Sequence, residues 1–126
     1  MRKTHSDRLK EILFLLASSP EVQLSVFPEF VHIPDEIASE TSDAIEYAPN
    51  KVNQEDSVIL SILRKVDAAF DEMGGDAENW TEESIKTSAV WRQIRLLAME
   101  GINSTRLQYK HPDLFWLAYF QNQPKQ

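Results

Sequence analysis

The chain has no cysteine among its 126 residues. It therefore cannot form a disulfide, use a thiol as a nucleophile or bind zinc through thiolates. A composition without cysteine fits the reducing cytoplasm, where disulfides do not persist. On this basis we expect a cytoplasmic protein.

Long apolar stretches are scarce near the N-terminus as well. The uninterrupted apolar run there covers residues 12–17 and directly follows the charged residues Asp7, Arg8, Lys10 and Glu11. A secretory signal needs a longer apolar region, of about 7 to 15 residues, and a membrane-spanning helix needs about 20. The sequence therefore predicts neither a signal peptide nor contact with a membrane.

Glycine is rare and occurs only at positions 74, 75 and 101. Enzymes that bind nucleotides use glycine-rich loops, which let the backbone approach the phosphates closely. No such loop is present, and neither are the Gly-x-Ser-x-Gly motif of hydrolases or the His-Glu-x-x-His motif of metalloproteases. These absences favour a protein with no enzymatic activity and no cofactor.

Histidine occurs three times, as His5, His32 and His111, and these residues are far apart in the sequence. Glu29 and His32 have the Glu-x-x-His spacing of carboxylate-bridged metal sites in helical bundles. Such sites need two copies of the motif on long helices, whereas here a single copy lies between two prolines. We therefore expect no metal site.

Negative charge is concentrated in the middle of the chain. The net charge is −7, yet residues 20–83 contain 16 acidic and only three basic residues, and the two ends carry an excess of basic residues. An acidic surface repels nucleic acids and anionic membranes and attracts basic proteins. We therefore expect a basic protein partner and no nucleic-acid partner.

The segment from Pro34 to Tyr47 is the most acidic of the predicted helices. Lysine and arginine are absent from residues 20–50, and like charges three and four residues apart destabilise an isolated helix by roughly 0.2–0.5 kcal/mol per pair. Two explanations remain open, namely a solvated face that tertiary packing tolerates and a docking face for a basic partner. The candidate docking residues on this helix are Asp35, Glu36, Glu40, Asp43 and Glu46.

The clearest helical pattern lies in residues 53–75. Asn53 is a good N-cap, and Gly74 and Gly75 predict a left-handed C-cap. A helix over about residues 54–73 would be roughly 30 Å long, which predicts a central position in the fold. Apolar residues three and four apart form its core-facing stripe, and Asp67, Asp71 and Glu72 on its outward face would extend the acidic docking surface.

Three further helices and one shorter turn or helix are predicted from capping residues and prolines. The helices cover about residues 7–17, 20–26 and 89–100, the last of them capped by Ser88, ended by Gly101 and with Arg95 facing away from the core. The shorter element follows Thr81. The helix at residues 7–17 is apolar on more than one side, so we expect several elements to cover it.

Pro112 and Asp113 predict one more helix start, followed by the nearly continuous apolar segment at residues 114–120. Such a segment belongs either to the core or to an interface, and its residue types also fit a strand. As a contact between two copies of the chain it would give a weak homodimer in place of a monomer. The candidate interface residues are Phe115, Trp116, Tyr119 and Phe120.

Together these patterns predict an all-α protein, a compact single domain over residues 1–126 with five or six helices around the helix at 54–73 and a frayed tail at about 123–126. The favoured function is non-enzymatic protein binding through an acidic surface. Its most concrete form is a bacterial immunity protein or antitoxin that blocks a nuclease toxin, because a nuclease site is basic in order to bind phosphate. The alternatives are a self-associating domain built on the aromatic C-terminal segment and a small enzyme with a carboxylate site.

Overall fold

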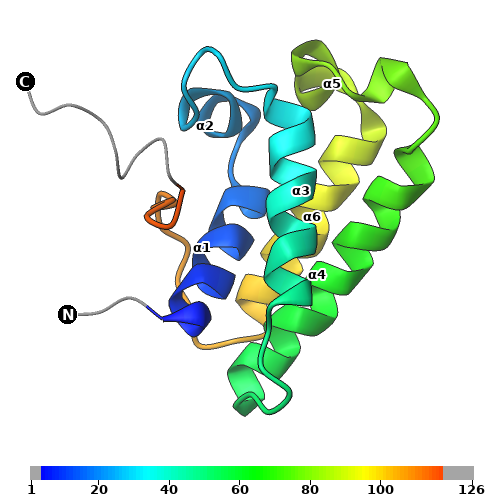
Figure 1. Ribbon diagram of the computed structural model, residues 1–126. Helices are drawn as coiled ribbons and strands as arrows, with labels where there is room; N and C mark the ends of the chain where they lie inside the picture. Colours follow the sequence, from blue (N-terminus) through cyan, green and yellow to red (C-terminus); the bar gives the residue numbers. More distant parts are fainter. Residues whose placement is uncertain (1–3, 118–126) are drawn as a thin grey trace, which may run out of the picture.

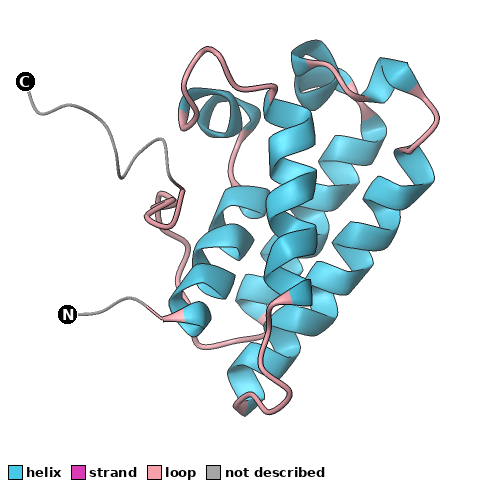
Figure 2. Ribbon diagram, viewed as in Figure 1, coloured by secondary structure: helices cyan, strands magenta, loops and turns pink. Residues whose placement is uncertain are grey.

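The computed structural model describes residues 4–117, and over this range the chain folds into six α-helices and one short 3-10 helix, with no strand (Figures 1 and 2). The predicted all-α bundle and its long helix at residues 54–73 are confirmed. No helix within the described range is both long and apolar enough to cross a membrane. The elements are α1 (His5–Ala17), α2 (Pro20–Ser25), α3 (Ile33–Glu46), α4 (Gln54–Met73), η1 (Ala77–Asn79), α5 (Glu82–Thr87) and α6 (Ala89–Asn103).

Four long helices enclose one hydrophobic core. α1 and α4 contact each other, α3 packs against both of them from one side, and α6 packs against both from the side behind (Figure 1). The short elements α2, η1 and α5 lie at the upper end in this view. The large apolar side chains with almost no exposure are Leu9, Ile12, Leu13, Leu15, Leu16, Ile37, Ile59, Leu63, Ile85, Trp91 and Ile94.

Side-chain caps mark the start of every described α-helix except α3, which follows His32 without such a hydrogen bond. The Asn53 side chain accepts a hydrogen bond from the backbone N–H of Asp56 at 2.8 Å, and Thr4 forms a reciprocal capping box with Asp7 at the start of α1. Thr81 and Ser88 cap α5 and α6 in the same way. Each cap satisfies a backbone N–H that has no partner inside its helix.

The end of α4 differs from the prediction. Gly74 has φ of −39°, and no described residue has a positive φ. The helix instead ends in backbone hydrogen bonds between residues three apart. Gly74 N–H donates to the Asp71 carbonyl at 3.1 Å, and Asp76 N–H donates to the Met73 carbonyl at 2.8 Å. These bonds satisfy the last carbonyls of the helix, so a left-handed residue is not required.

Gly101 does not end α6, contrary to the prediction, because the helix continues to Asn103. A Cβ atom at Gly101 would lie 3.0 Å from Ile62 Cγ1 and 3.3 Å from Leu13 Cδ1. The missing side chain therefore lets α6 approach both α1 and α4 closely. Gly101 therefore allows close helix packing. The sequence predicts a helix end at this position because the glycine lies near the end of an apolar pattern.

Arg95 does not face solvent, which corrects another prediction. Its Nη1 donates to the Ile85 carbonyl at 2.9 Å and to Gln23 Oε1 at 3.2 Å. The fully buried Gln23 in turn donates from Nε2 to the carbonyls of Leu15 and Leu16 at the end of α1. Burial lowers the pKa of Arg95, and the charge of Arg92 adds to this while Glu21 opposes it. Together, the hydrogen bonds of Arg95 and Gln23 join α6, α5 and α2 to α1.

The last described segment, residues 107–117, is named here the C-terminal strap. It leaves the end of α6 and runs back along α1 (Figure 1). The buried Glu11 carboxylate holds the strap against α1. This carboxylate accepts a hydrogen bond from the Asp113 backbone N–H at 2.8 Å and pairs with Lys110 Nζ at 2.8 Å. Leu114 and Leu117 are buried in the core beside it.

The helix predicted from Pro112 is not found in the described part of the chain, where residues 112–114 have no regular secondary structure and residues 115 and 116 lie in a turn. The physical reason is that the backbone of this segment bonds to α1 through Glu11, so its polar groups do not depend on a helix. Tyr119, Phe120 and the tail predicted to fray at 123–126 lie outside the described residues.

Replacing Gly101 by valine should lower the free energy of unfolding by about 1–3 kcal/mol, since the added atoms overfill the contact among α1, α4 and α6. Urea unfolding followed by tryptophan fluorescence measures this change. The matched control is Gly75→Ala, where an added Cβ meets nothing within 4 Å. If Gly101→Val is as stable as the wild type, the close approach does not limit packing.

Candidate protein-docking surface

The acidic residues of α3 divide into three kinds of environment. Asp35 and Glu46 are exposed, Glu36 and Asp43 are half-buried, and Glu40 is buried. Residues 20–50 contain no lysine or arginine. Any cation that neutralises this helix must therefore come from another part of the chain or from a partner.

Glu40 has its cation inside the protein. Its Oε1 accepts from Arg8 Nη2 at 3.1 Å and from the Trp116 indole Nε1–H at 2.6 Å, and the Arg8 guanidinium lies 5.3 Å from the Trp116 ring centroid. The side chains of Arg8 and Glu40 are only 19% and 11% exposed. We name this trio the Arg8–Glu40–Trp116 clasp. It joins α1, α3 and the C-terminal strap, so the prediction of Glu40 as a docking residue is corrected to a structural role.

The other α3 carboxylates repel one another. Partial burial raises the pKa of Glu36, and the charges of Glu40 and Asp43 raise it further together with a hydrogen bond to Glu40. Within the described residues, no cation lies within ion-pair distance of Glu36, Asp43 or Glu46. The fold thus holds negative charges together on the outer side of α3 without neutralising them.

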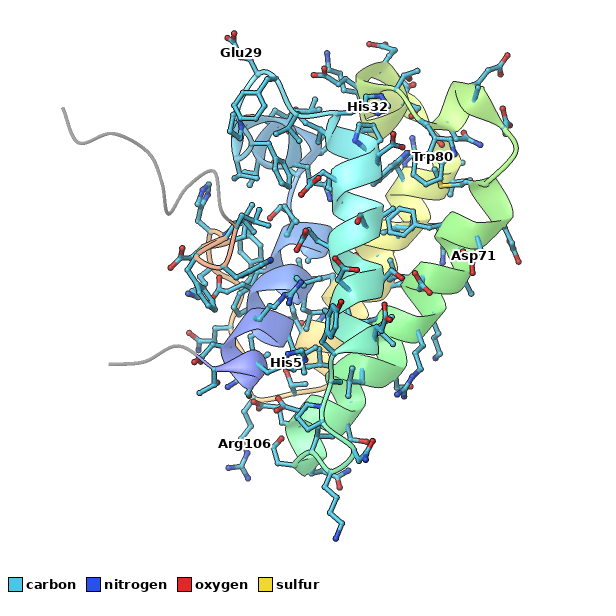
Figure 3. All side chains as sticks on the ribbon, in the orientation of Figure 1. His5, Glu29, His32, Asp71, Trp80 and Arg106 are labelled. Atoms are coloured by element: carbon cyan, nitrogen blue, oxygen red, sulfur yellow. The ribbon has the colours of Figure 1, made fainter. Side chains whose placement is uncertain are left out.

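The three candidate docking residues of α4 form a second group. Burial raises the pKa of the half-buried Asp67, and the charge of Asp71 adds to this. Asp71 and Glu72 are exposed, and Asp71 projects from the outer edge of α4 (Figure 3). Arg64 and Lys65 are also exposed on this helix and reduce its negative field. The stronger acidic surface is therefore the one on α3.

Three basic residues near the ends of the described chain form ion pairs within the protein. Lys110 pairs with Glu11 at 2.8 Å, Arg8 pairs with Glu40 at 3.1 Å, and Lys10 lies 3.8 Å from Glu55. All three pairs start from α1. Positive charge at the two ends of the chain is thus drawn to the α1 side, away from the outer face of α3.

Two exposed aromatic residues stand at the ends of α3. Phe30, just before the helix, is 79% exposed, and Tyr47, its C-cap residue, is 66% exposed. Phe27, in the same connection between α2 and α3, is buried. Tyrosine and other aromatic residues are common in the energetic centres of protein interfaces. The exposed aromatics therefore add apolar area to the acidic helix.

The Glu29/His32 spacing does not bring the two side chains together. Glu29 projects away from the helices, while His32 lies at the start of α3 (Figure 3) and its Nδ1 bonds to Asp35 Oδ2. In the described part of the chain, no three side chains of the metal-ligating types gather closely enough to hold an ion. His5 Nε2 lies 3.2 Å from the Ala44 carbonyl and joins α1 to α3.

The aromatic interface residues of the C-terminal strap are partly used within the protein. Phe115 and Trp116 are half-buried, and their rings meet edge to face with centroids 5.2 Å apart. Trp116 also belongs to the Arg8–Glu40–Trp116 clasp. The other two candidates, Tyr119 and Phe120, lie beyond the last described residue.

Comparisons with protein-family models, with curated proteins and with solved structures found no match to this chain. The candidate surface is therefore interpreted from its own geometry and charge.

Glu40→Gln should lower the free energy of unfolding by about 1.5–3 kcal/mol, the range for a hydrogen bond to a charged group, because Arg8 loses its carboxylate. Glu46→Gln removes the same charge from an exposed position of the same helix and should change stability by no more than about 0.5 kcal/mol. Urea unfolding of the two variants measures the difference. Equal stabilities would contradict a structural role for Glu40.

Glu36→Gln should raise the free energy of unfolding at pH 7. The pKa of Glu36 is higher in the folded protein than in the unfolded chain, so the folded state holds more protons between the two values and stability falls as pH rises through them. Above this window the Glu36 charge destabilises the fold, and below the ordinary value of 4.5 the effect is absent.

Urea unfolding from pH 3 to pH 8 tests this expectation. The gain of Glu36→Gln over the wild type should be largest at neutral pH and should disappear in acid. Glu29→Gln, an exposed matched change outside the helices, should give no gain at any pH. A gain that does not depend on pH would contradict the Glu36 charge as its cause.

Proposed function

We propose that this chain is a non-enzymatic binding protein that docks on a basic protein partner through the outer side of α3. The docking surface is named the α3 acidic face and consists of Asp35, Glu36, Asp43 and Glu46. The observation that carries the proposal is that no cation lies within ion-pair distance of Glu36, Asp43 or Glu46 in the described residues, so these like charges on one helix stay unneutralised and repel one another.

A basic partner would relieve this repulsion. The 14 residues of α3 span about 20 Å, which is long enough to cover a basic cleft on a protein of similar size. Opposite charges on the two surfaces would steer the encounter and speed association. Phe30 and Tyr47 at the two ends of α3 would supply the apolar contacts that slow dissociation.

The most concrete partner is a nuclease toxin, with this chain as a bacterial immunity protein or antitoxin in the cytoplasm. A nuclease cleft is lined with basic residues because it binds phosphate groups, so a rigid acidic helix can occupy it. α3 meets the requirement for rigidity, since His5, Arg8 and the neighbouring α4 hold it from one side.

The two alternatives receive less support. Self-association through the aromatic C-terminal segment would use Phe115 and Trp116, but Trp116 is bonded to Glu40 within the chain. A carboxylate enzyme built on Glu36 and Glu40 would need both groups in a cleft, whereas Glu40 is buried with Arg8 and Trp116. We therefore retain docking as the proposal.

The test measures association rates between the chain and basic nuclease domains encoded beside its gene, over a range of salt concentrations. A triple variant with Glu36, Asp43 and Glu46 changed to lysine should associate about 10-fold more slowly or worse at low salt, because electrostatic steering contributes 10-fold or more. The difference should shrink at high salt, where charges are screened.

The control changes an exposed acid on another helix. Glu100→Lys on α6 should keep most of the wild-type rate, since α6 lies behind α3 (Figure 1). If the triple variant associates as fast as the wild type at every salt concentration, the α3 acidic face is not the docking surface.

A further inference from the structure

A separate cleft opens where the start of α3 meets the loop that follows α4. Its volume is about 550 Å³. Figure 3 shows His32 and Trp80 at this end of the bundle, one at the start of α3 and the other beyond η1. The cleft is lined by His32, Asp35, Gly74, Gly75, Ala77 and Trp80, and we name it the Trp80 cleft.

Asp35 brings an accessible carboxylate to the Trp80 cleft. The imidazole Nδ1 of His32 is bonded to Asp35 Oδ2, so the carboxylate is held in place. Both side chains remain more than half exposed, at 64% for His32 and 59% for Asp35. The carboxylate can therefore accept further hydrogen bonds from a group that enters the cleft.

Trp80 forms an aromatic wall with a fixed position. Its indole Nε1–H points to the Met73 carbonyl at 3.4 Å, and its ring packs against Phe70 with centroids 6.1 Å apart and planes 33° apart. Phe70 itself is buried and contacts Trp91. The indole is thus supported from the core side and only half-buried on the side of the cleft.

The backbone at the floor of the cleft also favours a cation. Gly74 and Gly75 follow the C-terminus of the 20-residue helix α4, where the helix dipole is negative. No side chain covers this floor, and a Cβ at Gly75 would meet nothing within 4 Å. The N-terminus of α3 contributes the opposite dipole, but Asp35 and Glu36 lie in its first turn and offset it.

The side chains that line the cleft include no lysine or arginine, and its histidine, His32, is hydrogen-bonded to Asp35. Residues 20–50 and 66–85, which supply its walls, contain no lysine or arginine. Another cleft, lined in part by Asn53, Glu55 and Arg106, is larger at about 640 Å³, but Arg106 already brings a cation to it and no aromatic side chain lines it. The Trp80 cleft combines a carboxylate with an aromatic wall, and no lysine or arginine is among its lining residues.

We infer that the Trp80 cleft receives an arginine side chain of the basic partner, between the Asp35 carboxylate and the Trp80 indole. Arginine fits better than lysine because its planar guanidinium both stacks on aromatic rings and donates in parallel to a carboxylate. The inference rests on the proposed docking of a basic protein. It adds a specific anchor at one end of the α3 acidic face.

The first test uses N-acetyl-arginine amide as the probe and its citrulline analogue, which lacks the charge, as the comparison. Nuclear magnetic resonance follows the indole N–H signals of Trp80 and of the fully buried Trp91. The arginine derivative should shift the Trp80 signal in a saturable way and leave Trp91 nearly unchanged, and the citrulline derivative should shift neither. Equal shifts with both probes, or none at Trp80, would overturn the inference.

Asp35→Asn keeps the shape of the side chain and should weaken binding of the arginine probe about fivefold, through loss of the charged partner. Glu100→Gln removes the same charge from an exposed position on α6 that lines neither this cleft nor the larger one, and it should leave probe binding unchanged. Trp80→Leu should also weaken binding, and the Asp35 variant decides the question if the leucine variant does not fold. Unchanged binding in Asp35→Asn would contradict the arginine site.

Measurements with the nuclease partner separate this inference from the proposed function. If the triple lysine variant of α3 slows association but Asp35→Asn and Trp80→Leu leave the partner's affinity unchanged, docking stands and the arginine anchor is wrong. If association is unaffected by the triple variant, docking itself fails, and the anchor for a partner's arginine fails with it. Because Asp35 also belongs to the α3 acidic face, the anchor is supported only if Trp80→Leu weakens the partner's affinity as well.

Discussion

The rest of the structure depends on the burial of α1 on all its sides. Residues 11–18 are buried without interruption, so no single neighbour can cover them. α3, α4 and α6 supply three sides, with Gly101 letting α6 come close. Gln23 of α2 satisfies two carbonyls at the end of α1, and the C-terminal strap covers the remaining side through Glu11.

This arrangement also determines which charged side chains form ion pairs. The cations of α1 and the strap are drawn into pairs around α1, among them Arg8 with Glu40 and Lys110 with Glu11. α3 contacts α1 through its inner side, so only Glu40 shares in that neutralisation. Glu36, Asp43 and Glu46 stay without a cation among the described residues, and partial burial together with the charges of Glu40 and Asp43 raises the pKa of Glu36. The proposed docking surface is thus a consequence of how α1 is buried.

The Trp80 cleft and the α3 acidic face meet at Asp35. This residue lies in the first turn of α3 and lines the cleft as well. A basic partner that covers the α3 acidic face could therefore place one side chain in the cleft without any rearrangement. In such an arrangement the charged surface sets the rate of association, while the pocket that holds the anchoring side chain sets the specificity.

The sequence by itself determined the local structure. Caps such as Asn53 and Thr4, and the apolar period of residues 54–73, act over one or two helical turns, so the helix starts and the all-α fold could be read directly. The density of acidic residues on α3 was equally visible. These features need no knowledge of which elements become neighbours.

Only the tertiary structure decided which of these residues are free to act. Glu40 looks like its neighbours on α3, but Arg8 is 32 residues away and Trp116 is 76 residues away in the chain. Gly101 looks like a stop, yet its role is set by Ile62 and Leu13. The Trp80 cleft joins residues 32–35 with residues 74–80. Contacts at such separations depend on how whole helices pack, which a local pattern of residues does not encode.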